Sequence, residues 1–337
     1  MKFIPTPNED LNLVMGGGFP VGKITTVAGQ FDSGKTSLIL ETIGKQMAKD
    51  PEFICLWLET ENSLTLDYMI DQFHIDPKRF IFIRSDLRDG GEKAFDRCES
   101  YLKTGTINFF AVNSLRGVVP KTELEKSVTE ATVAEQARMN TKVLKKFMNI
   151  ADEHNIAMVI VQHLTTLIGT FSKDPYSIGG GLLLKYASHI IIDMRKQTVQ
   201  ESEPVTKETG MKIMIYIRKN HVTARTFPYV KVLHYVVYGE GTEQYFTTLN
   251  KAVKEGIINR AGRMITWEDH GLKFGSKDEY KQYMIEHPEE FQTLKNEAYS
   301  IYSAEVLTDE EMEELHINPE QDEQDELEAA RLLAEED

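Results

Sequence analysis

Short apolar runs alternate with polar, helix-like stretches along most of the chain. The runs are rich in Ile, Val and Phe, and they are KITTVAG (23–29), FICLWLET (53–60), RFIFIRS (79–85), INFFAVNS (107–114), AMVIVQH (157–163), HIIIDMR (189–195), KIMIYIRKN (212–220) and VKVLHYVVYG (230–239). Helical stretches, such as Thr36–Ala48 and Ala134–His154, separate the earlier runs. Because strict apolar–polar alternation is missing, the runs predict strands that are buried on both faces. The pattern therefore predicts an α/β fold with a mostly parallel, doubly wound sheet, and the last runs predict antiparallel strands at one end of it.

The pattern changes after about residue 240. Residues 242–306 read as short helices around WEDHGLKFGSKDEY and predict a small second domain. We expect a short N-terminal arm over residues 1–10, a large core over 11–240, a small α+β C-terminal domain over 241–306 and an acidic tail over 307–337.

Composition is that of an ordinary globular protein, with 337 residues, 41% hydrophobic and 27% charged. No apolar run approaches the ~20 residues of a membrane helix. The start, MKFIPTPNED, has no apolar segment of the kind found in secretory signals. There are two cysteines, and Cys55 lies within an apolar run as an expected core residue. These features predict a reducing, cytoplasmic location and no membrane partner.

The net charge of −15 is concentrated at one end of the chain. Between Thr308 and Asp337 there are 14 acidic residues and one arginine, so the rest of the chain carries a net charge of only −2. The overall charge therefore does not exclude a nucleic-acid surface on the body of the protein.

The segment AGQFDSGKTS (28–37) contains the pattern G-x-x-x-x-G-K-[ST] of a phosphate-binding loop. The loop residues are Gly29, Gln30, Phe31, Asp32, Ser33, Gly34, Lys35, Thr36 and the following Ser37. Glycines let backbone N–H groups converge on phosphates, the lysine reaches the β- and γ-phosphates, and the Thr36 hydroxyl is a Mg²⁺ ligand. A plain strand-to-helix turn is the alternative. Because a predicted strand and helix flank the motif in the right order, the segment predicts a nucleoside triphosphate site.

The surroundings of this loop resemble the RecA family of bacterial recombinases and its phage branch, such as UvsX. The resemblance is carried by GGGFPVGKITTVAGQFDSGKTSLILETI, ETENSLTLDYM, NSLRGVVPKTELE, GGGLLLKYASHIIIDMR, YIRKNHV, VVYGEGTEQY, VKEGIINRAG and GLKFGSKDEYKQYMIEHPE, and so spans about Leu11 to Tyr302. It implies a RecA-like P-loop ATPase core that uses ATP and Mg²⁺. It also implies an ATP-dependent recombinase that forms filaments on single-stranded DNA and catalyses homology search and strand exchange in recombination and repair.

Catalytic roles follow from the resemblance for Lys35 and for two further residues. Glu61 stands where the family has its catalytic glutamate, which orients or deprotonates the attacking water. A surface glutamate at a strand end is the alternative. His163 stands where RecA has a glutamine that senses the γ-phosphate, and a histidine at this position is similar to the phage branch of the family. A histidine in an ordinary packing role is the alternative.

The metal site departs from the family pattern. Asn113 stands where the family has an aspartate that holds Mg²⁺ through water, and Thr36 is the expected second metal residue. An asparagine offers a neutral carbonyl oxygen, so some electrostatic stabilisation is lost and slow hydrolysis is expected.

Further residues match nucleotide-side or subunit-interface positions of the family. Tyr68 and Tyr238 match aromatic residues beside the nucleotide. Lys219 and His221 match two basic residues that reach the γ-phosphate of a neighbouring subunit, the second being a lysine in RecA. Tyr186 matches an aromatic residue that packs on the neighbour, and a core role is the alternative for the tyrosines.

Two segments match the DNA-facing loops of the family, one from about Glu125 to Glu135 and one from Leu164 to Gly181. The DNA-binding residues that the resemblance and the loop composition indicate are Val133, Arg138, Lys145, Ile168, Phe171, Lys173, Tyr176, Gly179, Gly180 and Gly181. Arg138 and Lys145 are seven positions apart, so they share one face of a helix. The first loop also carries Glu125, Glu130 and Glu135, and a solvated lid is the alternative for it.

Expected partners are single-stranded and duplex DNA, further copies in a homo-oligomeric helical filament, a single-strand-binding protein and a loading mediator. Only 28 residues precede Gly29, too few for the helical N-terminal module of RecA, so the arm or another surface is expected to join the protomers. Basic residues of the C-terminal region match a duplex-collecting surface, which the acidic tail would modulate: Lys251, Lys254, Arg260, Arg263, Lys273 and Lys277. A RecA-like helicase or motor, and a poorly hydrolysing ATP-binding mediator, remain as alternatives.

Overall fold

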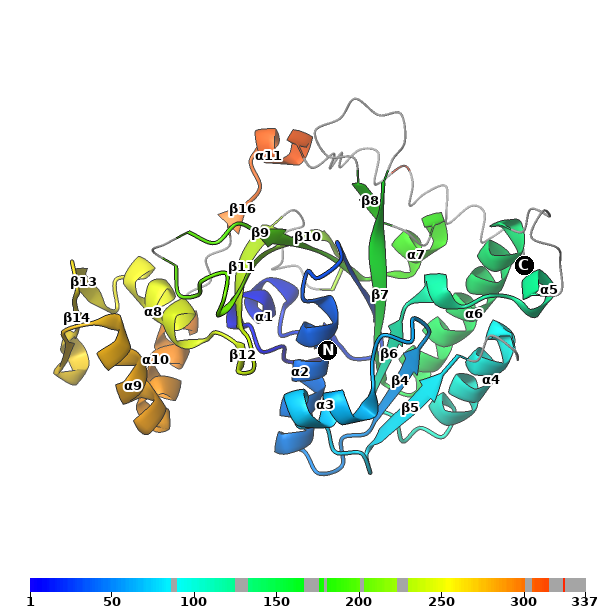
Figure 1. Cartoon of the computed structure of the whole chain (residues 1–337), viewed down its shortest axis with the longest axis horizontal. Helices are drawn as coiled ribbons and strands as arrows, with labels where there is room; N and C mark the ends of the chain where they lie inside the picture. Colours follow the sequence, from blue (N-terminus) through cyan, green and yellow to red (C-terminus); the bar gives the residue numbers. More distant parts are fainter. Residues whose placement is uncertain are drawn as a thin grey trace.

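A mixed β-sheet runs through the centre of the protein (Figure 1). The computed structural model describes residues 1–85, 90–124, 133–166, 176–178, 181–200, 203–222, 230–300, 305–314 and 324. From one edge to the other, the strands are β12 (Gly241–Thr242), β11 (Val230–Val237), β10 (Gly210–Asn220), β9 (Ile190–Gln197), β3 (Ile24–Gly29), β7 (Ala157–Thr166), β6 (Phe109–Asn113), β4 (Cys55–Glu59) and β5 (Phe80–Arg84). Two short strands branch from this path, β8 (Tyr176–Ile178) on β7 and β16 (Glu305–Val306) on β11.

The strand directions confirm the predicted sheet. Along the path from β9 through β3, β7, β6 and β4 to β5, each strand is parallel to the next. The strands β10, β11 and β12 pair in antiparallel fashion with the strands beside them. Each predicted run coincides with an observed strand, and the predicted fold class is confirmed.

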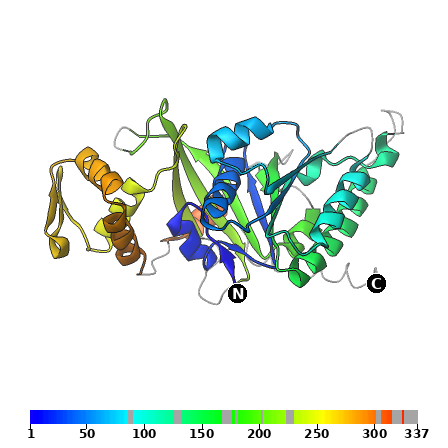
Figure 2. The same ribbon diagram turned by 90° about the horizontal axis from the view of Figure 1, so that it is seen from below.

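Helices cover both faces of the sheet, as Figure 2 shows. On one face lie α1 (Glu9–Met15), α2 (Lys35–Lys49) and α3 (Leu66–Phe73), and on the other lie α4 (Gly91–Leu102), α6 (Val133–Glu153) and α7 (Gly181–Ala187). Strand β4 shows the consequence, because Trp57 belongs to the first core cluster while Leu56 and Leu58 belong to the second. Burial on both faces explains why the strands lack apolar–polar alternation. Two short helical segments, η1 (Leu115–Gly117) and α5 (Lys121–Leu124), follow β6.

The C-terminal region has a separate apolar cluster of its own. Its elements are α8 (Tyr245–Lys254), β13 (Asn259–Ala261), β14 (Met264–Trp267), η2 (Glu268–His270), β15 (Leu272–Phe274), α9 (Lys277–Glu286) and α10 (Pro288–Ser300). Fully buried Trp267 and Tyr280 lie in this cluster. Strands β13, β14 and β15 form a small antiparallel sheet beside these helices, so residues 242–306 are not helical alone and contain the α+β mixture expected of this region. The proposed boundary near residue 241 falls at β12, and α11 (Asp309–Glu314) follows β16.

The N-terminal residues are built into their own protomer. Strand β1 (Phe3–Ile4) pairs with β2 (Phe19–Pro20) of the same chain. Buried Asn12 accepts hydrogen bonds at Oδ1 from the backbone N–H of Thr6 (2.7 Å) and from its hydroxyl (2.8 Å). A Cβ on Gly18, whose φ is +118°, would lie 2.2 Å from the carbonyl oxygen of Ile4, so this close approach requires glycine. The expected short arm therefore folds back on the core and is not extended.

Every helix in the described part of the chain is too short or too polar to pass through a bilayer.

A buried histidine fixes α1 to the sheet and predicts a pH dependence of stability. Asn8 caps α1, and its Nδ2 lies 3.2 Å from Nδ1 of His234 on β11. Burial lowers the pKa of His234 to about 4, from about 6.5 in an unfolded chain. Between pH 6.5 and pH 4, His234 is therefore protonated in the unfolded state but neutral in the folded state. Its contribution to the free energy of unfolding is fully present above pH 6.5 and is lost as the pH falls toward 4. We expect the free energy of unfolding to drop by about 2 kcal/mol between pH 7 and pH 5 on account of this residue.

Denaturant unfolding of the native protein and of His234→Gln at both pH values measures this contribution. Glutamine has an acceptor for the Asn8 amide but does not titrate in this range, so its pH dependence should be shallower by that amount. An equal loss of stability in the two proteins would show that His234 does not carry the effect.

Candidate functional site

The predicted phosphate loop lies between β3 and α2, at the carboxyl end of the parallel strands (Figure 1). Gly34 takes φ +77° at the N-cap of α2, a conformation that glycine adopts without strain. A Cβ on Gly29 would lie 2.4 Å from the Met194 carbonyl oxygen and 2.6 Å from Ser33 Oγ. These two positions therefore require glycine for the loop to fold as it does.

The loop presents a row of free backbone donors. None of the N–H groups from Phe31 to Ser37 donates a hydrogen bond to another described residue. These groups surround the amino end of α2, a helix of 15 residues whose dipole places positive potential there. Free N–H groups at a helix N-terminus are a ready binding site for an anion such as phosphate.

Lys35 points its ammonium group back into this loop. Its Nζ donates to the carbonyl oxygens of Gln30 (2.5 Å) and Gly29 (3.2 Å) and to Ser33 Oγ (3.4 Å). Burial lowers the pKa of Lys35 to about 8, although nearby Glu61, Asp32 and Asp193 act in the opposite direction. A desolvated cation held only by neutral acceptors gains strongly from an arriving phosphate.

The same loop fits the magnesium complex of a nucleotide. Thr36 is the second residue of α2, and Asn113 ends β6, which β7 separates from β3. Mg²⁺ in nucleotide sites usually keeps several waters and takes one or two protein ligands beside the phosphates. A hydroxyl at 36 and an amide oxygen at 113 match that requirement, without the charge of an aspartate.

Two of the predicted catalytic residues meet beside the phosphate loop, Glu61 just after β4 and His163 within β7. Glu61 Oε1 lies 3.0 Å from His163 Nε2 and accepts a hydrogen bond of 2.7 Å from the hydroxyl of Ser114. The ring of Phe31, 80% exposed, stacks on the His163 ring with centroids 4.5 Å apart. His163 Nδ1 is buried and has no hydrogen-bond partner among the described residues. Phosphate loop, sensor position and catalytic position are thus in direct contact.

Glu59 is a site residue that sequence reasoning missed. Its side chain is fully buried at the end of β4, and its carboxylate accepts hydrogen bonds from Trp57 Nε1 (3.2 Å) and Asn113 Nδ2 (3.0 Å). It also accepts from the backbone N–H of Glu61 (3.1 Å). An acidic residue inside the run FICLWLET was the available signal, because a carboxylate is seldom buried without a specific task.

The aromatic residues assigned to the nucleotide side are exposed. Tyr68 is 47% exposed on α3 and packs edge-on against Phe73. Tyr238 is 49% exposed and lines a cavity of about 440 Å³ together with Lys196, Lys207 and Met211. Neither tyrosine is a core residue, so the alternative reading fails for both.

The residues assigned to a subunit interface differ in burial. Lys219 is largely buried, and its Nζ donates to the carbonyl oxygens of Lys185 (2.9 Å) and Tyr186 (3.4 Å) at the end of α7. His221 is exposed and follows β10, where its backbone N–H donates to the carbonyl oxygen of His189. The Tyr186 side chain is exposed.

The residues assigned to DNA binding are described only in part. Val133 is the first residue of α6, and Arg138 is exposed on the same helix, two turns before Lys145. Tyr176 begins β8, which pairs with the end of β7, and Gly181 begins α7. Ile168, Phe171, Lys173, Gly179 and Gly180 lie outside the described residues.

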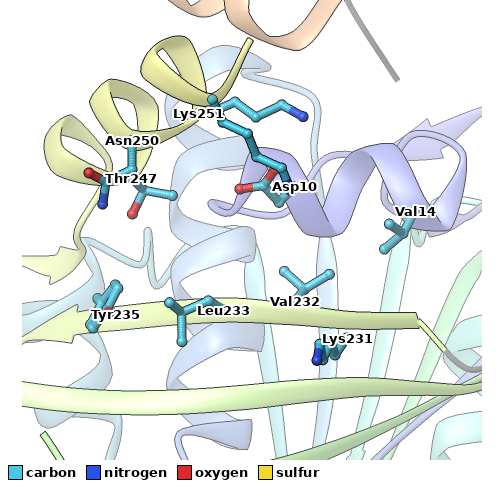
Figure 3. A pocket seen from close by; sticks show the side chains of 10 residues that line it. Asp10, Val14, Lys231, Val232, Leu233, Tyr235, Thr247, Asn250 and Lys251 are labelled. Carbon is cyan, nitrogen blue, oxygen red and sulfur yellow. The ribbon is translucent and has the colours of Figure 1, made fainter. Parts of the chain in front are cut away.

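The basic residues of the C-terminal region include one that is not on the surface. Lys254, Arg260, Arg263 and Lys273 are exposed. Lys251 is buried beside a pocket of about 220 Å³ between α1, β11 and α8 (Figure 3), and its Nζ pairs with Glu255 at 2.9 Å. Its assignment to a duplex-collecting surface was therefore wrong. In the acidic tail, Glu311 pairs with Lys231 of β11 at 2.7 Å.

Comparison with known proteins agrees with this geometry. Residues 1–243 match the family model of the RecA N-terminal domain. The chain is 28% identical to Protein RecA of Aquifex aeolicus over 290 residues, which cover 86% of this chain and 81% of the relative. It is 26% identical to Protein RecA of Aquifex pyrophilus over 302 residues (89% and 83%) and 26% identical to that of Thermus aquaticus over 293 residues (87% and 83%).

The matched segment contains the phosphate loop, Glu61, Asn113 and His163, so the likeness includes the whole nucleotide site described above. The match covers well over half of the chain. The chain belongs to the RecA family, the DNA-dependent ATPases that use ATP and Mg²⁺ in DNA recombination and repair.

Proposed function

We propose that this recombinase, with ATP bound, assembles into a helical filament on single-stranded DNA, aligns duplex DNA by homology and exchanges strands. The observation that carries the proposal is the position of His163. This residue contacts both Phe31 of the phosphate loop and Glu61, and it lies on β7, the strand that leads into the segment 164–181. A change at His163 on nucleotide binding would therefore reach the proposed DNA segment through a single strand.

In this proposal, backbone N–H groups of residues 31–37 and Lys35 bind the β- and γ-phosphates. Mg²⁺ supplies charge neutralisation at the phosphates when it is bound. Thr36 and Asn113 would hold Mg²⁺, Glu61 would orient or deprotonate the attacking water, and His163 would donate a hydrogen bond to the γ-phosphate. Tyr68 and Tyr238 flank the nucleobase.

A neighbouring protomer completes the site in the proposed filament. Lys219 and His221 would reach the γ-phosphate of the adjacent copy, and Tyr186 would pack on it. Lys219 would have to leave the carbonyl oxygens at the end of α7, so assembly would exchange an internal contact for one between protomers.

Single-stranded DNA would be bound by the segments around Val133, Arg138 and Lys145 and around residues 164–181. We expect binding with little sequence preference, because base pairing supplies the choice of sequence and backbone contacts supply the affinity. A single-strand-binding protein and a loading mediator are proposed further partners, and membership of the phage branch stays a prediction.

Electron microscopy of the protein with single-stranded DNA and a slowly hydrolysed ATP analogue tests the proposal. We expect extended helical fibres with the analogue and none without nucleotide, together with an ATPase rate that rises when single-stranded DNA is added. Duplex DNA of matching sequence should be taken up by the fibres, and duplex of unrelated sequence should not.

Two other outcomes would contradict it. Closed rings with strand-separating activity would favour a motor. Nucleotide binding without fibres and without turnover would favour a mediator role, in keeping with the neutral side chain of Asn113.

A further inference from the structure

A negative charge is buried next to the position where the metal-binding carboxylate of the family is missing. Glu59 and Asn113 are direct neighbours in the parallel pairing of β4 and β6. The Glu59 side chain is fully buried, and Asn113 is 2% exposed. Among the described residues, no Lys, Arg or His forms an ion pair with Glu59, so neutral donors alone satisfy this carboxylate.

The donors divide between the two carboxylate oxygens. Oε1 accepts from the turn that follows β4, namely from the backbone N–H groups of Glu61 (3.1 Å) and Ser63 (3.4 Å) and from Ser63 Oγ (3.3 Å). Oε2 accepts from Trp57 Nε1 and from Asn113 Nδ2. Stabilising the turn explains the first set of bonds but does not explain the bond to Asn113.

That bond fixes the orientation of an amide whose two ends differ chemically. A primary amide has donors on its nitrogen and an acceptor on its oxygen. Because Nδ2 of Asn113 donates to Glu59, Oδ1 is directed away from Glu59, and it accepts no hydrogen bond from another described residue. Only an acceptor at position 59 holds the amide this way, whereas a donor there favours the reversed amide.

We propose that Glu59 is a positioning residue that directs Oδ1 of Asn113 toward the metal side of the nucleotide site. The amide oxygen then takes the place of the family's aspartate, and the negative charge lies one strand away on Glu59. The same carboxylate accepts a hydrogen bond from the backbone N–H of Glu61. One buried group therefore orients both Asn113, the proposed metal ligand, and Glu61, the proposed partner of the attacking water. This inference rests on the proposed roles of Asn113 and Glu61.

The pairing of one carboxylate with one amide predicts what happens when the carboxylate is moved from position 59 on β4 to position 113 on β6. Asn113→Asp alone places two carboxylates in contact in a fully buried position, where they repel each other. In Glu59→Gln alone, the three donors of the turn that face Oε1 take the new amide oxygen, and the new amide N–H therefore faces Asn113. The asparagine then reverses and turns Nδ2 toward the metal side. The double variant restores one carboxylate and one amide, because the new amide at position 59 can donate to the new carboxylate at position 113.

Binding of a fluorescent ATP analogue, titrated with Mg²⁺, measures the effect without relying on hydrolysis. Loss of a partner that orients a metal-side residue typically costs about 10- to 100-fold in metal affinity. We therefore expect Glu59→Gln to raise the half-saturating Mg²⁺ concentration at least ~10-fold, and the double variant to return to within about threefold of the native value. The melting temperature of the nucleotide-free protein should fall in Asn113→Asp and recover in the double variant.

Ser63→Ala is the matched control, because it removes a donor to Oε1 and leaves the bond to Asn113 intact. It should leave the Mg²⁺ requirement unchanged. If Glu59→Gln lowers the melting temperature but leaves the Mg²⁺ requirement at the native value, Glu59 only stabilises the turn and the inference is overturned.

Asn113→Ala gives a second test that leaves Glu59 in place, should the Glu59 variant not fold. The inference expects the same rise in the Mg²⁺ requirement, and an unchanged requirement overturns it. Failure of the proposed function would give a different result in this assay. The native protein itself would then bind no ATP analogue at any Mg²⁺ concentration.

Discussion

Replacing Lys35 by alanine should abolish nucleotide-dependent binding to single-stranded DNA. The ammonium group is held at the centre of the phosphate loop by two carbonyl oxygens and one hydroxyl. Hydrogen bonds from a charged donor contribute roughly 1.5–3 kcal/mol each, so losing this group should weaken ATP binding by about 3 kcal/mol, or about a hundredfold. Fluorescence anisotropy of a labelled oligonucleotide, with and without ATP at constant salt, measures the consequence for DNA binding.

Lys49→Ala is the control, since Lys49 is exposed at the other end of the same helix. It removes the same charge from α2 and should leave both affinities unchanged. If ATP still stimulates DNA binding by Lys35→Ala as much as by the native protein, nucleotide binding at the phosphate loop does not control the DNA segments.

The pattern of apolar runs was sufficient to predict the central sheet, for an identifiable physical reason. In β4, Cys55 and Trp57 face one helical layer while Leu56 and Leu58 face the other, so every position before the terminal Glu59 is apolar. Helix α2 was predicted to within one residue at each end, because it begins at the phosphate loop and ends before the turn at Asp50. Strands of three or four residues, such as β14 and β15, are too short to show a period.

Helix α1 shows a signal that was available and was not used. The segment NEDLNLVMG has a capping asparagine, two acidic residues in the first turn and a glycine with φ +81° after the last turn. These are the start and stop signals of a helix, so NEDLNLVMG could have been recognised as a helix that begins within the expected arm and continues into the core.

The motif residues of the site could be predicted from the sequence, whereas the contacts between residues far apart in the chain could not. Gly29, Gly34 and Lys35 follow from the loop pattern, because their roles depend on local geometry. The contacts of Glu59 with Asn113 and of Glu61 with His163 join residues that are 54 and 102 positions apart. Such pairs depend on the order and register of the parallel strands, which no local pattern specifies.

These long-range contacts also suggest how the site responds to its ligand. In this structure Glu61 and His163 contact each other, and Phe31 stacks on the histidine. An arriving γ-phosphate would compete with Glu61 for the donor on His163 and would release the carboxylate toward water. The strand β7 would then transmit the change at His163 to the segment that begins at Leu164.

Replacing Glu61 by glutamine should therefore stop turnover while leaving binding intact. Glutamine keeps an oxygen that accepts from Ser114 and His163, but it cannot take a proton from water. Positioned general-base catalysis contributes about 10²–10⁴-fold, so we expect steady-state ATPase with single-stranded DNA to fall at least ~100-fold, with affinity for an ATP analogue almost unchanged. Fibres formed with ordinary ATP should persist, because hydrolysis no longer disassembles them.

Glu52→Gln, an exposed change in the turn before β4, is the matched control and should hydrolyse ATP at the native rate. Near-native turnover in Glu61→Gln would remove Glu61 from the reaction and leave it as a partner of His163 alone. If Glu61→Gln loses both turnover and nucleotide binding, the Glu61 carboxylate is needed to maintain the phosphate loop. The contact between residue 61 and His163 would then require a negative charge, since an uncharged acceptor would not be enough.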